Sequence, residues 1–286
     1  MSREARLGRV AIAGVGLIGG SLGLALRNGI AREVVGIGRR RESIDLAQRL
    51  GAIDRGTLDF QEGCKDAEIV VVATPVASVV DVVRVVAEAA PRAVITDVAS
   101  TKAEICRSLA GIRTFVGGHP MAGSHKRGVQ VARADLFKDA VAILCPTEQT
   151  DARAVSTVAA MWEAVGARIV ALSPAEHDRM IAEASHLPHA AAACLVRTVS
   201  RDALRFAATG YADSTRVASG DPELWSQILL SNRFEVRRAL EGLCHRLVEL
   251  GDALLAQDAE AVKRILSEAR DLRDAFTSPP QARSGE

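Results

Sequence analysis

The sequence predicts a two-part α/β fold, in which a mainly parallel sheet covered by helices is followed by an all-helical part. Up to about residue 172, short apolar runs alternate with amphipathic segments, which is typical of a parallel sheet buried on both faces. Beyond Pro174 the apolar runs stop and only helical spacing remains. We therefore expect one domain over residues 1–173, a helical domain over 174–277 and a disordered tail over 278–286.

The first part contains seven strand candidates with helix candidates between them. The strands are expected over 9–14, 33–38, 68–75, 93–98, 114–118, 140–146 and 167–172. Helical spacing covers 42–50, 76–90, 101–110 and 151–165, and in the second part 175–206, 222–256 and 258–276. The helical period is clearest in Leu240, Leu243, Leu247, Leu250 and Leu254.

The composition is that of a globular protein without a surface for nucleic acid or membrane. The 286 residues are 48% apolar, 25% charged and 3% aromatic, with a formal net charge of +1, which offers neither a basic footprint nor stacking platforms for bases. No apolar run approaches the ~18 residues of a membrane span, and the first ten residues lack the apolar stretch of a signal peptide. Five scattered cysteines without a C-x-x-C pair indicate reduced thiols and no zinc site. We expect a cytoplasmic protein.

The stretch VAIAGVGLIGGSLGLAL carries a dinucleotide-binding signature. Gly14, Gly16 and Gly19 form the pattern G-x-G-x-x-G between the first predicted strand and a helix. The first glycine makes a tight turn, the second leaves room for a pyrophosphate, and the third lets the helix pack closely on the strand. The anion then lies at the helix N-terminus, where N–H groups and the dipole favour negative charge. The pattern predicts a Rossmann-type domain that binds NAD or NADP, with a merely structural turn as the alternative.

The end of the second predicted strand favours NADP. An acidic residue at this point usually binds the ribose 2′-hydroxyl of NAD, but here Gly38 is followed by three arginines. Guanidinium groups pair with a 2′-phosphate, and no carboxylate repels it. We expect NADP to be preferred and NAD to be possible; a solvated basic turn without preference is the alternative. The expected cofactor contacts are Gly14, Gly16, Leu17, Ile18, Gly19, Arg39, Arg40, Thr74 and Pro75.

Two strand-to-helix junctions supply polar residues for chemistry. DVASTK places Ser100 after the strand at 93–98, and FVGGHPMAGS places His119 after the next strand. Because ligands of open parallel sheets bind beyond the carboxyl ends of the strands, we expect Ser100 and His119 to be neighbours. An imidazole with an ordinary pKa near ~6.5 can accept a proton at neutral pH. A histidine in a glycine-rich turn can equally be structural.

The helical part adds two histidines and an arginine. His186 and His189 in SHLPH are three residues apart and share a helix face, while Pro188 between them predicts a bend or break. They lack a third ligand at useful spacing, so we expect no metal site. Arg216 precedes a Gly-Asp-Pro turn, where it can bind a substrate carboxylate or form an ordinary surface ion pair.

Taken together, these motifs resemble those of the prephenate and arogenate dehydrogenases, the oxidative decarboxylases of tyrosine biosynthesis. The motifs are GVGLIGGS, DVASTK, GGHPMAGS, HDRMIAEASHLPH and STRVASGDPELW, and they span roughly residues 10 to 235 in the order of the family. The resemblance implies a Rossmann domain, a helical domain that forms a homodimer, and an active site between the two. It implies that prephenate or arogenate gives hydride from C4 to NAD(P) and loses CO2, which yields 4-hydroxyphenylpyruvate or tyrosine.

The resemblance also implies roles for residues of this chain. His119 hydrogen-bonds the substrate hydroxyl, assisted by Ser100, and Arg216 binds the side-chain carboxylate. The remaining substrate contacts that it implies are His186, His189, Ser124, His125 and Trp225. Many relatives carry an acidic residue where this chain has His125. The basic run that starts there suits the keto acid of prephenate better than the ammonium group of arogenate.

Two other classes fit part of the pattern. A β-hydroxyacid dehydrogenase needs a lysine in the helical part, where Lys263 lies in a late amphipathic segment that reads as solvated. A module that senses NADP without turnover would keep the glycines but would not need His119, Ser100 and Arg216. We expect neither a β-rich regulatory ACT domain nor a fused chorismate mutase within these 286 residues.

Overall fold

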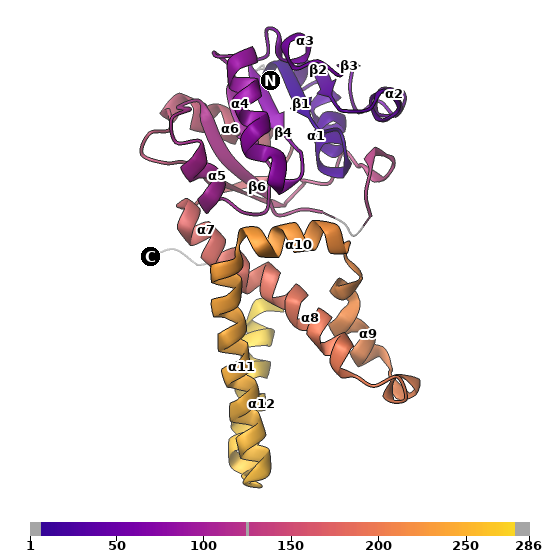
Figure 1. Ribbon diagram of the computed structural model, residues 1–286, viewed down its shortest axis with the longest axis vertical. Coiled ribbons are helices and arrows are strands. Elements are labelled where there is room, and N and C mark those ends of the chain that lie inside the picture. The colour runs from indigo at the N-terminus through magenta and orange to yellow at the C-terminus, as the bar shows by residue number, and fades with distance from the viewer. Residues whose placement is uncertain (1–6, 124–125, 278–286) are drawn as a thin grey trace, which may run out of the picture. The chain divides into compact units, whose positions relative to one another are not determined.

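The computed structural model describes residues 7–123 and 126–277. Ser124 and His125, and the tail predicted over 278–286, lie outside the described residues. The chain divides into two compact units, Met1–Val236 and Arg237–Glu286. The first unit holds the sheet, the helices around it and the helices that carry His177, His186 and His189 (Figure 1).

An eight-stranded sheet forms the centre of the first unit. Its strands are β1 (Leu7–Ala13), β2 (Ala31–Ile37), β3 (Arg55–Thr57), β4 (Ile69–Val72), β5 (Val94–Asp97), β6 (Phe115–Pro120), β7 (Val141–Cys145) and β8 (Arg168–Ala171). They lie in the order β3-β2-β1-β4-β5-β6-β7-β8, and only the β6–β7 pair is antiparallel. The predicted α/β class with a mainly parallel sheet is confirmed, and every strand candidate is a strand. The sequence analysis missed β3, a three-residue edge strand without an apolar run.

Helices cover both faces of the sheet. Buried side chains of α1 (Leu17–Arg27), α2 (Arg41–Arg49) and α6 (Ala152–Ala164) belong to one core cluster, and those of α3 (Phe60–Cys64), α4 (Val79–Ala89) and α5 (Ala103–Ser108) belong to the other. In β1, Val10 and Ile12 join the first cluster whereas Ala11 and Ala13 join the second, because successive side chains of a strand point to opposite faces. Because the helices cover the two faces, ligands are expected at the carboxyl ends of the strands, where such sheets bind them.

A run of helices follows the sheet within the first unit. It comprises α7 (Pro174–Ile181), η3 (Ala182–His186), α8 (Leu187–Thr198), η4 (Ala203–Phe206), α9 (Thr209–Thr215), η5 (Arg216–Ser219) and α10 (Pro222–Ser231). A capping box of Ser173 and Glu176 begins α7. The break predicted at Pro188 takes the form of η3, a π-helical turn that leads directly into α8. With this turn the helix continues past Pro188, which has no backbone N–H to donate a hydrogen bond.

The domain boundary that we expect at residue 173 stays a prediction. The last strand, β8, ends at Ala171 and α7 begins at Pro174, so the chain changes there from sheet to helix. The division into compact units lies elsewhere, after Val236.

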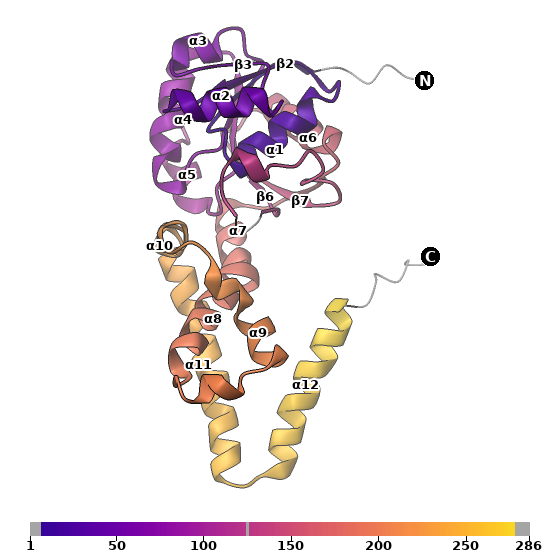
Figure 2. The ribbon, with the colours of Figure 1, turned by 90° about the vertical axis from the view of Figure 1, so that its right-hand side faces the viewer.

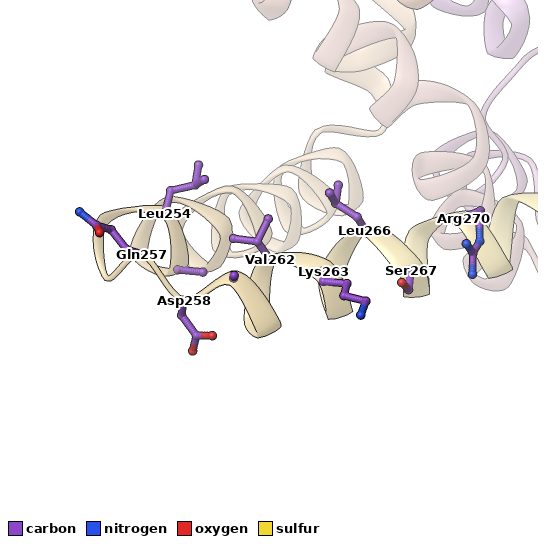
Figure 3. A pocket seen from close by; sticks show the side chains of 10 residues that line it. Leu254, Gln257, Asp258, Val262, Lys263, Leu266, Ser267 and Arg270 are labelled. Atoms are coloured by element: carbon purple, nitrogen blue, oxygen red, sulfur yellow. The ribbon is translucent and has the colours of Figure 1, made fainter.

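The second unit is a helical hairpin. It consists of α11 (Arg233–Leu255) from Arg237 onward and of α12 (Ala259–Thr277), joined by a short turn (Figure 2). A pocket of about 580 Å³ lies in the bend of the hairpin and is lined partly by Leu254, Val262 and Leu266 (Figure 3). Large apolar side chains are exposed on both helices, among them Leu247, Leu255, Leu272 and Phe276. No helix in the described part of the chain combines the length and apolar character that crossing a membrane requires.

Candidate active site

The glycine-rich turn between β1 and α1 has the shape that a dinucleotide needs. Gly14 has φ +99°, and a Cβ there would lie 2.5 Å from the carbonyl oxygen of Ala73, so only glycine fits. At Gly19 a Cβ would lie 2.1 Å from the carbonyl oxygen of Gly14. At Gly16 nothing lies within 4 Å of the Cβ position, and α1 begins without a side-chain cap or an acidic residue in its first turn. Its first N–H groups are therefore available to an anion.

A buried hydroxyl beside this turn also fits a bound cofactor. Thr74 follows β4, which pairs with β1. A Cβ on Gly14 would lie 3.2 Å from the backbone nitrogen of Thr74. The Oγ1 of Thr74 is buried without a hydrogen-bond partner among the described residues. The strand order reverses between β1 and β4, the position at which open α/β sheets bind ligands. These residues therefore fit a dinucleotide, as do Leu17 and Ile18 at the start of α1 and Pro75 after Thr74.

Arg39 and Arg40 are exposed directly after β2, and neither side chain forms an ion pair or hydrogen bond with another described residue. A Cβ on Gly38 would lie 2.9 Å from the side chain of Ile44 in α2. Any side chain at this place, where NAD-binding folds usually have an acidic one, would require the side chain of Ile44 to shift.

His119 begins a chain of hydrogen bonds that ends on a carboxylate. Its Nδ1 lies 2.9 Å from Nε2 of His177, and Nδ1 of His177 lies 2.8 Å from Oδ1 of Asp178. His119 comes from β6 whereas His177 and Asp178 come from α7, so the sheet and the helical run meet at this point. All three side chains are buried.

The carboxylate fixes which nitrogen carries each proton. A carboxylate only accepts hydrogen bonds, so Nδ1 of His177 donates to Asp178, and in the neutral form of the ring Nε2 of His177 keeps its lone pair. Nδ1 of His119 must then donate to His177. This leaves Nε2 of His119 as a proton acceptor, and no other described residue bonds to it.

The surroundings keep the His119 ring neutral. Burial is the main cause that lowers the pKa of His119 well below 6.5, and the nearby His177, Lys102 and His186 lower it further. A neutral imidazole with a free nitrogen can take up a proton during a reaction.

Asp178 is itself held at the start of α5. Its carboxylate accepts the backbone N–H groups of Lys102 at 2.7 Å and of Ala103 at 2.9 Å. The N-terminal end of a helix favours such an anion. The carboxylate at the end of the hydrogen-bond chain is therefore fixed by backbone groups.

A second carboxylate fixes the loop that carries Ser100. Asp97, at the end of β5, accepts the backbone N–H groups of Ala99 at 2.9 Å and of Gly118 at 3.0 Å. It also forms an ion pair with Lys102, in which both side chains are completely buried. Ser100 is half-buried in this loop. The loop of Ser100 and the strand of His119 are thus tied to the same carboxylate.

The second part of the candidate site is a cluster of aromatic rings. The rings of His189 and Trp225 stack with their centroids 3.5 Å apart, and Trp225 meets His186 edge-on at 6.3 Å. A Cβ on Gly220 would lie 2.6 Å from Nε1 of Trp225 and 2.7 Å from Cε1 of His189, so this glycine lets the turn before α10 approach the rings. Both histidines therefore contact one indole, as expected for residues on one helix face.

Asn232 joins the ring cluster to the hydrogen-bond chain. Its Nδ2 lies 2.7 Å from the backbone oxygen of Asp178 and 3.2 Å from Nδ1 of His186. Burial lowers the pKa of His186 to about 4, and burial also lowers the pKa of His189. No three His, Cys, Asp or Glu side chains among the described residues are grouped as a metal site requires.

Arg216 is exposed at the start of η5, which packs against α8. The same turn leads into Gly220, so the segment of the arginine lies beside the ring cluster. The described contacts do not join its side chain to His119. Arg127 forms an ion pair with Asp221, the N-cap residue of α10. Ser124 and His125, also expected in the substrate site, lie outside the described residues.

Sequence reasoning missed His177, Asp178 and Asn232. The first two lie in the quoted motif HDRMIAEASHLPH, where a His-Asp pair just after a helix cap was a usable signal. Asn232 carried no signal, because its partners are 46 and 54 residues away along the chain.

Two family profiles match the chain. Residues 22–171 match "Prephenate dehydrogenase, nucleotide-binding domain" and residues 173–268 match "Prephenate dehydrogenase, dimerization domain". Prephenate dehydrogenase of Bacillus subtilis is 36% identical over 280 residues, which are 93% of this chain and 76% of that protein. Cyclohexadienyl dehydrogenase of Zymomonas mobilis is 31% identical over 93% of this chain and 95% of that protein.

Solved structures of similar proteins give the same result. Prephenate dehydrogenase of Aquifex aeolicus, crystallised with hydroxyphenyl propionate and NAD+, superposes with a TM-score of 0.90 at 31% identity, over 96% of this chain and 100% of that one. Arogenate dehydrogenase of Synechocystis superposes with a TM-score of 0.84 at 28% identity, over 94% of this chain and 100% of that one.

A dinucleotide-type glycine turn at the switch point of the sheet and a buried neutral histidine define an NAD(P)-linked oxidoreductase. Within this class, the chain belongs to the prephenate dehydrogenase family. The reaction of that family is the oxidative decarboxylation of prephenate, coupled to hydride transfer to a nicotinamide cofactor, and it belongs to tyrosine biosynthesis.

Proposed function

We propose that this chain oxidises and decarboxylates prephenate with His119 as the proton acceptor. The observation that carries the proposal is the series His119–His177–Asp178, which ends at Nε2 of a buried, neutral imidazole without a partner among the described residues. When bound at the glycine turn, the nicotinamide cofactor accepts the hydride that the substrate gives up.

His119 handles the proton of the ring hydroxyl. As hydride leaves C4, positive charge builds on the carbon that carries the hydroxyl, and Nε2 of His119 accepts the hydroxyl proton. The bond between the ring and its carboxylate breaks, its electron pair completes the aromatic ring, and CO2 leaves. Nε2 then returns the proton to the phenol oxygen, so the reaction consumes no net proton. Ser100, on the loop tied to Asp97, assists at the same hydroxyl.

His177 and Asp178 support this proton transfer. They hold His119 in the tautomer whose Nε2 is free, so no ring flip or proton shift precedes the reaction. Once Nε2 is protonated, the Nδ1–H of the imidazolium makes a charge-assisted hydrogen bond to His177, and such bonds are roughly twice as strong as neutral ones. Both effects stabilise the transition state more than the bound substrate.

The remaining residues bind the substrate. Arg216 binds the side-chain carboxylate, and the ring cluster forms a wall of the pocket. The members of this substrate set are His186, His189, Trp225, Ser124 and His125. We place prephenate before arogenate because His125 stands where many relatives have an acidic residue and is followed by Lys126 and Arg127, and a basic set favours a dianion. Arg127 adds less, because Asp221 neutralises its charge.

NADP is the preferred cofactor in this proposal, with NAD as a possible one. Arg39 and Arg40 are exposed at the end of β2 without a carboxylate partner among the described residues. A 2′-phosphate supplies the partner that they lack.

The enzyme works as a homodimer in this proposal. Residues 174–277 form the helical substrate and dimerisation domain, which begins where the strands end, and 1–173 form the cofactor domain. The hairpin of the second unit exposes Leu247, Leu255, Leu272 and Phe276, and exposed apolar surface of this kind favours cover by another chain. The unpaired cysteines and the nicotinamide chemistry favour a location in the cytoplasm.

A side-by-side comparison of kcat/KM tests the proposed function. Prephenate and arogenate are each assayed with NADP and with NAD, and reduced nicotinamide is followed by its near-ultraviolet absorbance. Prephenate with NADP should give the highest value. No turnover of either substrate would favour the sensing module, and turnover of small β-hydroxyacids instead would favour the other dehydrogenase class, although Lys263 is exposed in α12.

A further inference from the structure

One buried nitrogen in the ring cluster lacks a partner. Nε2 of His186 is buried and forms no hydrogen bond with any described residue, and the residue as a whole is only 1% exposed. Buried polar atoms are rarely left unpaired, because an unpaired group loses its water without compensation. The nitrogen is therefore open to a partner that the described residues do not supply, such as a ligand atom.

The contact on the other side of the ring determines what kind of ligand atom fits. The amide of Asn232 lies 2.7 Å from the backbone oxygen of Asp178. A carbonyl oxygen only accepts hydrogen bonds, so the amide atom at this position is the NH2 group. The same NH2 lies 3.2 Å from Nδ1 of His186. An NH2 group only donates, so Nδ1 accepts and the ring proton of neutral His186 sits on Nε2.

We propose that Asn232 is a positioning residue, which holds His186 as the Nε2–H tautomer so that the imidazole donates a hydrogen bond to an acceptor oxygen of the substrate. The acceptor is a carboxylate or keto oxygen. The inference rests on the proposed function only in taking this acceptor to belong to the substrate. The proposal also gives a reason for the nearly buried amide of Asn232, which is 5% exposed and is the C-cap residue of α10. The two hydrogens of this amide bond to the backbone oxygen of Asp178 and to Nδ1 of His186.

The chemical state of the ring fits this role. Burial lowers the pKa of His186 to about 4, so the donor is uncharged at neutral pH. A neutral N–H orients an oxygen anion without forming an ion pair. Strong ion pairing would stabilise bound substrate as much as the transition state and would not raise the rate of the chemical step.

The tautomer can be measured directly, without turnover. The protein is labelled with 15N-histidine, and long-range 1H–15N spectra are recorded near neutral pH, with the His186 signals assigned by their loss in His186→Gln. The wild type should show a protonated Nε2 and an unprotonated Nδ1. In Asn232→Asp the new carboxylate accepts from Nδ1, so the proton should move to Nδ1. A wild type with its proton on Nδ1 would overturn the proposal, whatever its activity.

Steady-state kinetics test the donor role. When a hydrogen bond that is made in both the ground state and the transition state is removed, KM rises and kcat changes little. Asn232→Asp should therefore raise the KM for prephenate about 10-fold or more, with little change in kcat. His186→Gln keeps an N–H at similar reach and should raise KM less than His186→Leu. An unchanged KM in a folded Asn232→Asp protein whose tautomer has moved would overturn the donor role.

Two comparisons make the result specific. In the His186→Leu background, Asn232→Asp should add little to KM, which separates the loss of the His186 contact from the loss of the bond to Asp178. Arogenate lacks the keto group but keeps both carboxylates. An equal rise in KM for both substrates assigns the acceptor to a carboxylate, and a rise for prephenate alone assigns it to the keto oxygen. If the wild type turns over neither substrate, the proposed function fails while the spectra still decide the tautomer.

Discussion

Replacing His177 by leucine tests the hydrogen-bond chain behind His119. The change removes the acceptor that lies 2.9 Å from Nδ1 of His119 and the donor that lies 2.8 Å from Asp178. Leucine fills most of the same buried space, and Asp178 keeps its bonds to the backbone N–H groups of Lys102 and Ala103. The variant should therefore fold, while His119 loses its fixed tautomer and the partner of its imidazolium.

The size of the effect follows from the lost bond. A hydrogen bond to a charged group contributes about 1.5–3 kcal/mol, and each ~1.4 kcal/mol corresponds to a tenfold change in rate. Because this charge exists only as the proton is transferred, the loss should fall on kcat, by roughly 10- to 100-fold. His177→Gln, whose amide oxygen is an acceptor at similar reach, should lose less.

The assay compares kcat and KM of both variants with those of the wild type at saturating cofactor. Cofactor affinity, measured by fluorescence titration, should not change, because His177 is not among the cofactor contacts. A folded leucine variant with the kcat of the wild type would refute the role of His177. Equal losses in the leucine and glutamine variants would refute the argument that an acceptor at this position matters.

Three further predictions concern the proton, the substrate and the cofactor. Because burial holds the pKa of His119 well below 6.5, kcat/KM should stay on its plateau as the pH falls through 6.5 and decline only at lower pH, when His119 takes up a proton; an acid limb centred at 6.5 or above would contradict this. Arg216→Ala should raise the KM for prephenate much more than it lowers kcat, whereas a fall in kcat at unchanged KM would remove the arginine from substrate binding. Joint replacement of Arg39 and Arg40 by alanine should raise the KM for NADP and leave that for NAD nearly unchanged, and equal changes for both cofactors would argue against a 2′-phosphate site.

The fold was largely predictable from sequence because its core is made of continuous apolar strands. Runs such as 68–75 are long enough to reveal buried strands without any knowledge of their partners. β3 escaped because an edge strand of three residues is defined by its pairing with β2 rather than by its own side chains. The form of the break at Pro188 was also hidden: a proline predicts an interruption, but neighbouring helical turns decide that it becomes a π turn.

The candidate site was predictable only where its residues lie in a short, recognisable sequence motif. The glycine turn and His119 stand in such motifs, and their surroundings follow from strand-to-helix junctions. His177 and Asn232 act through contacts 58 and 46 residues away along the chain, which no spacing rule reveals. The buried Asp97–Lys102 ion pair shows a related difficulty, since a lysine after a strand usually indicates a solvated turn rather than a completely buried group.

The central claim is that Nε2 of His119 takes the proton of the substrate hydroxyl, and His119→Asn tests it most directly. Single-turnover and steady-state rates with prephenate and NADP should fall by ~10²–10⁴-fold, the range typical of one acid–base group, while the affinity for NADP stays that of the wild type. A His119→Asn enzyme that turns over prephenate at a nearly normal rate would contradict the account.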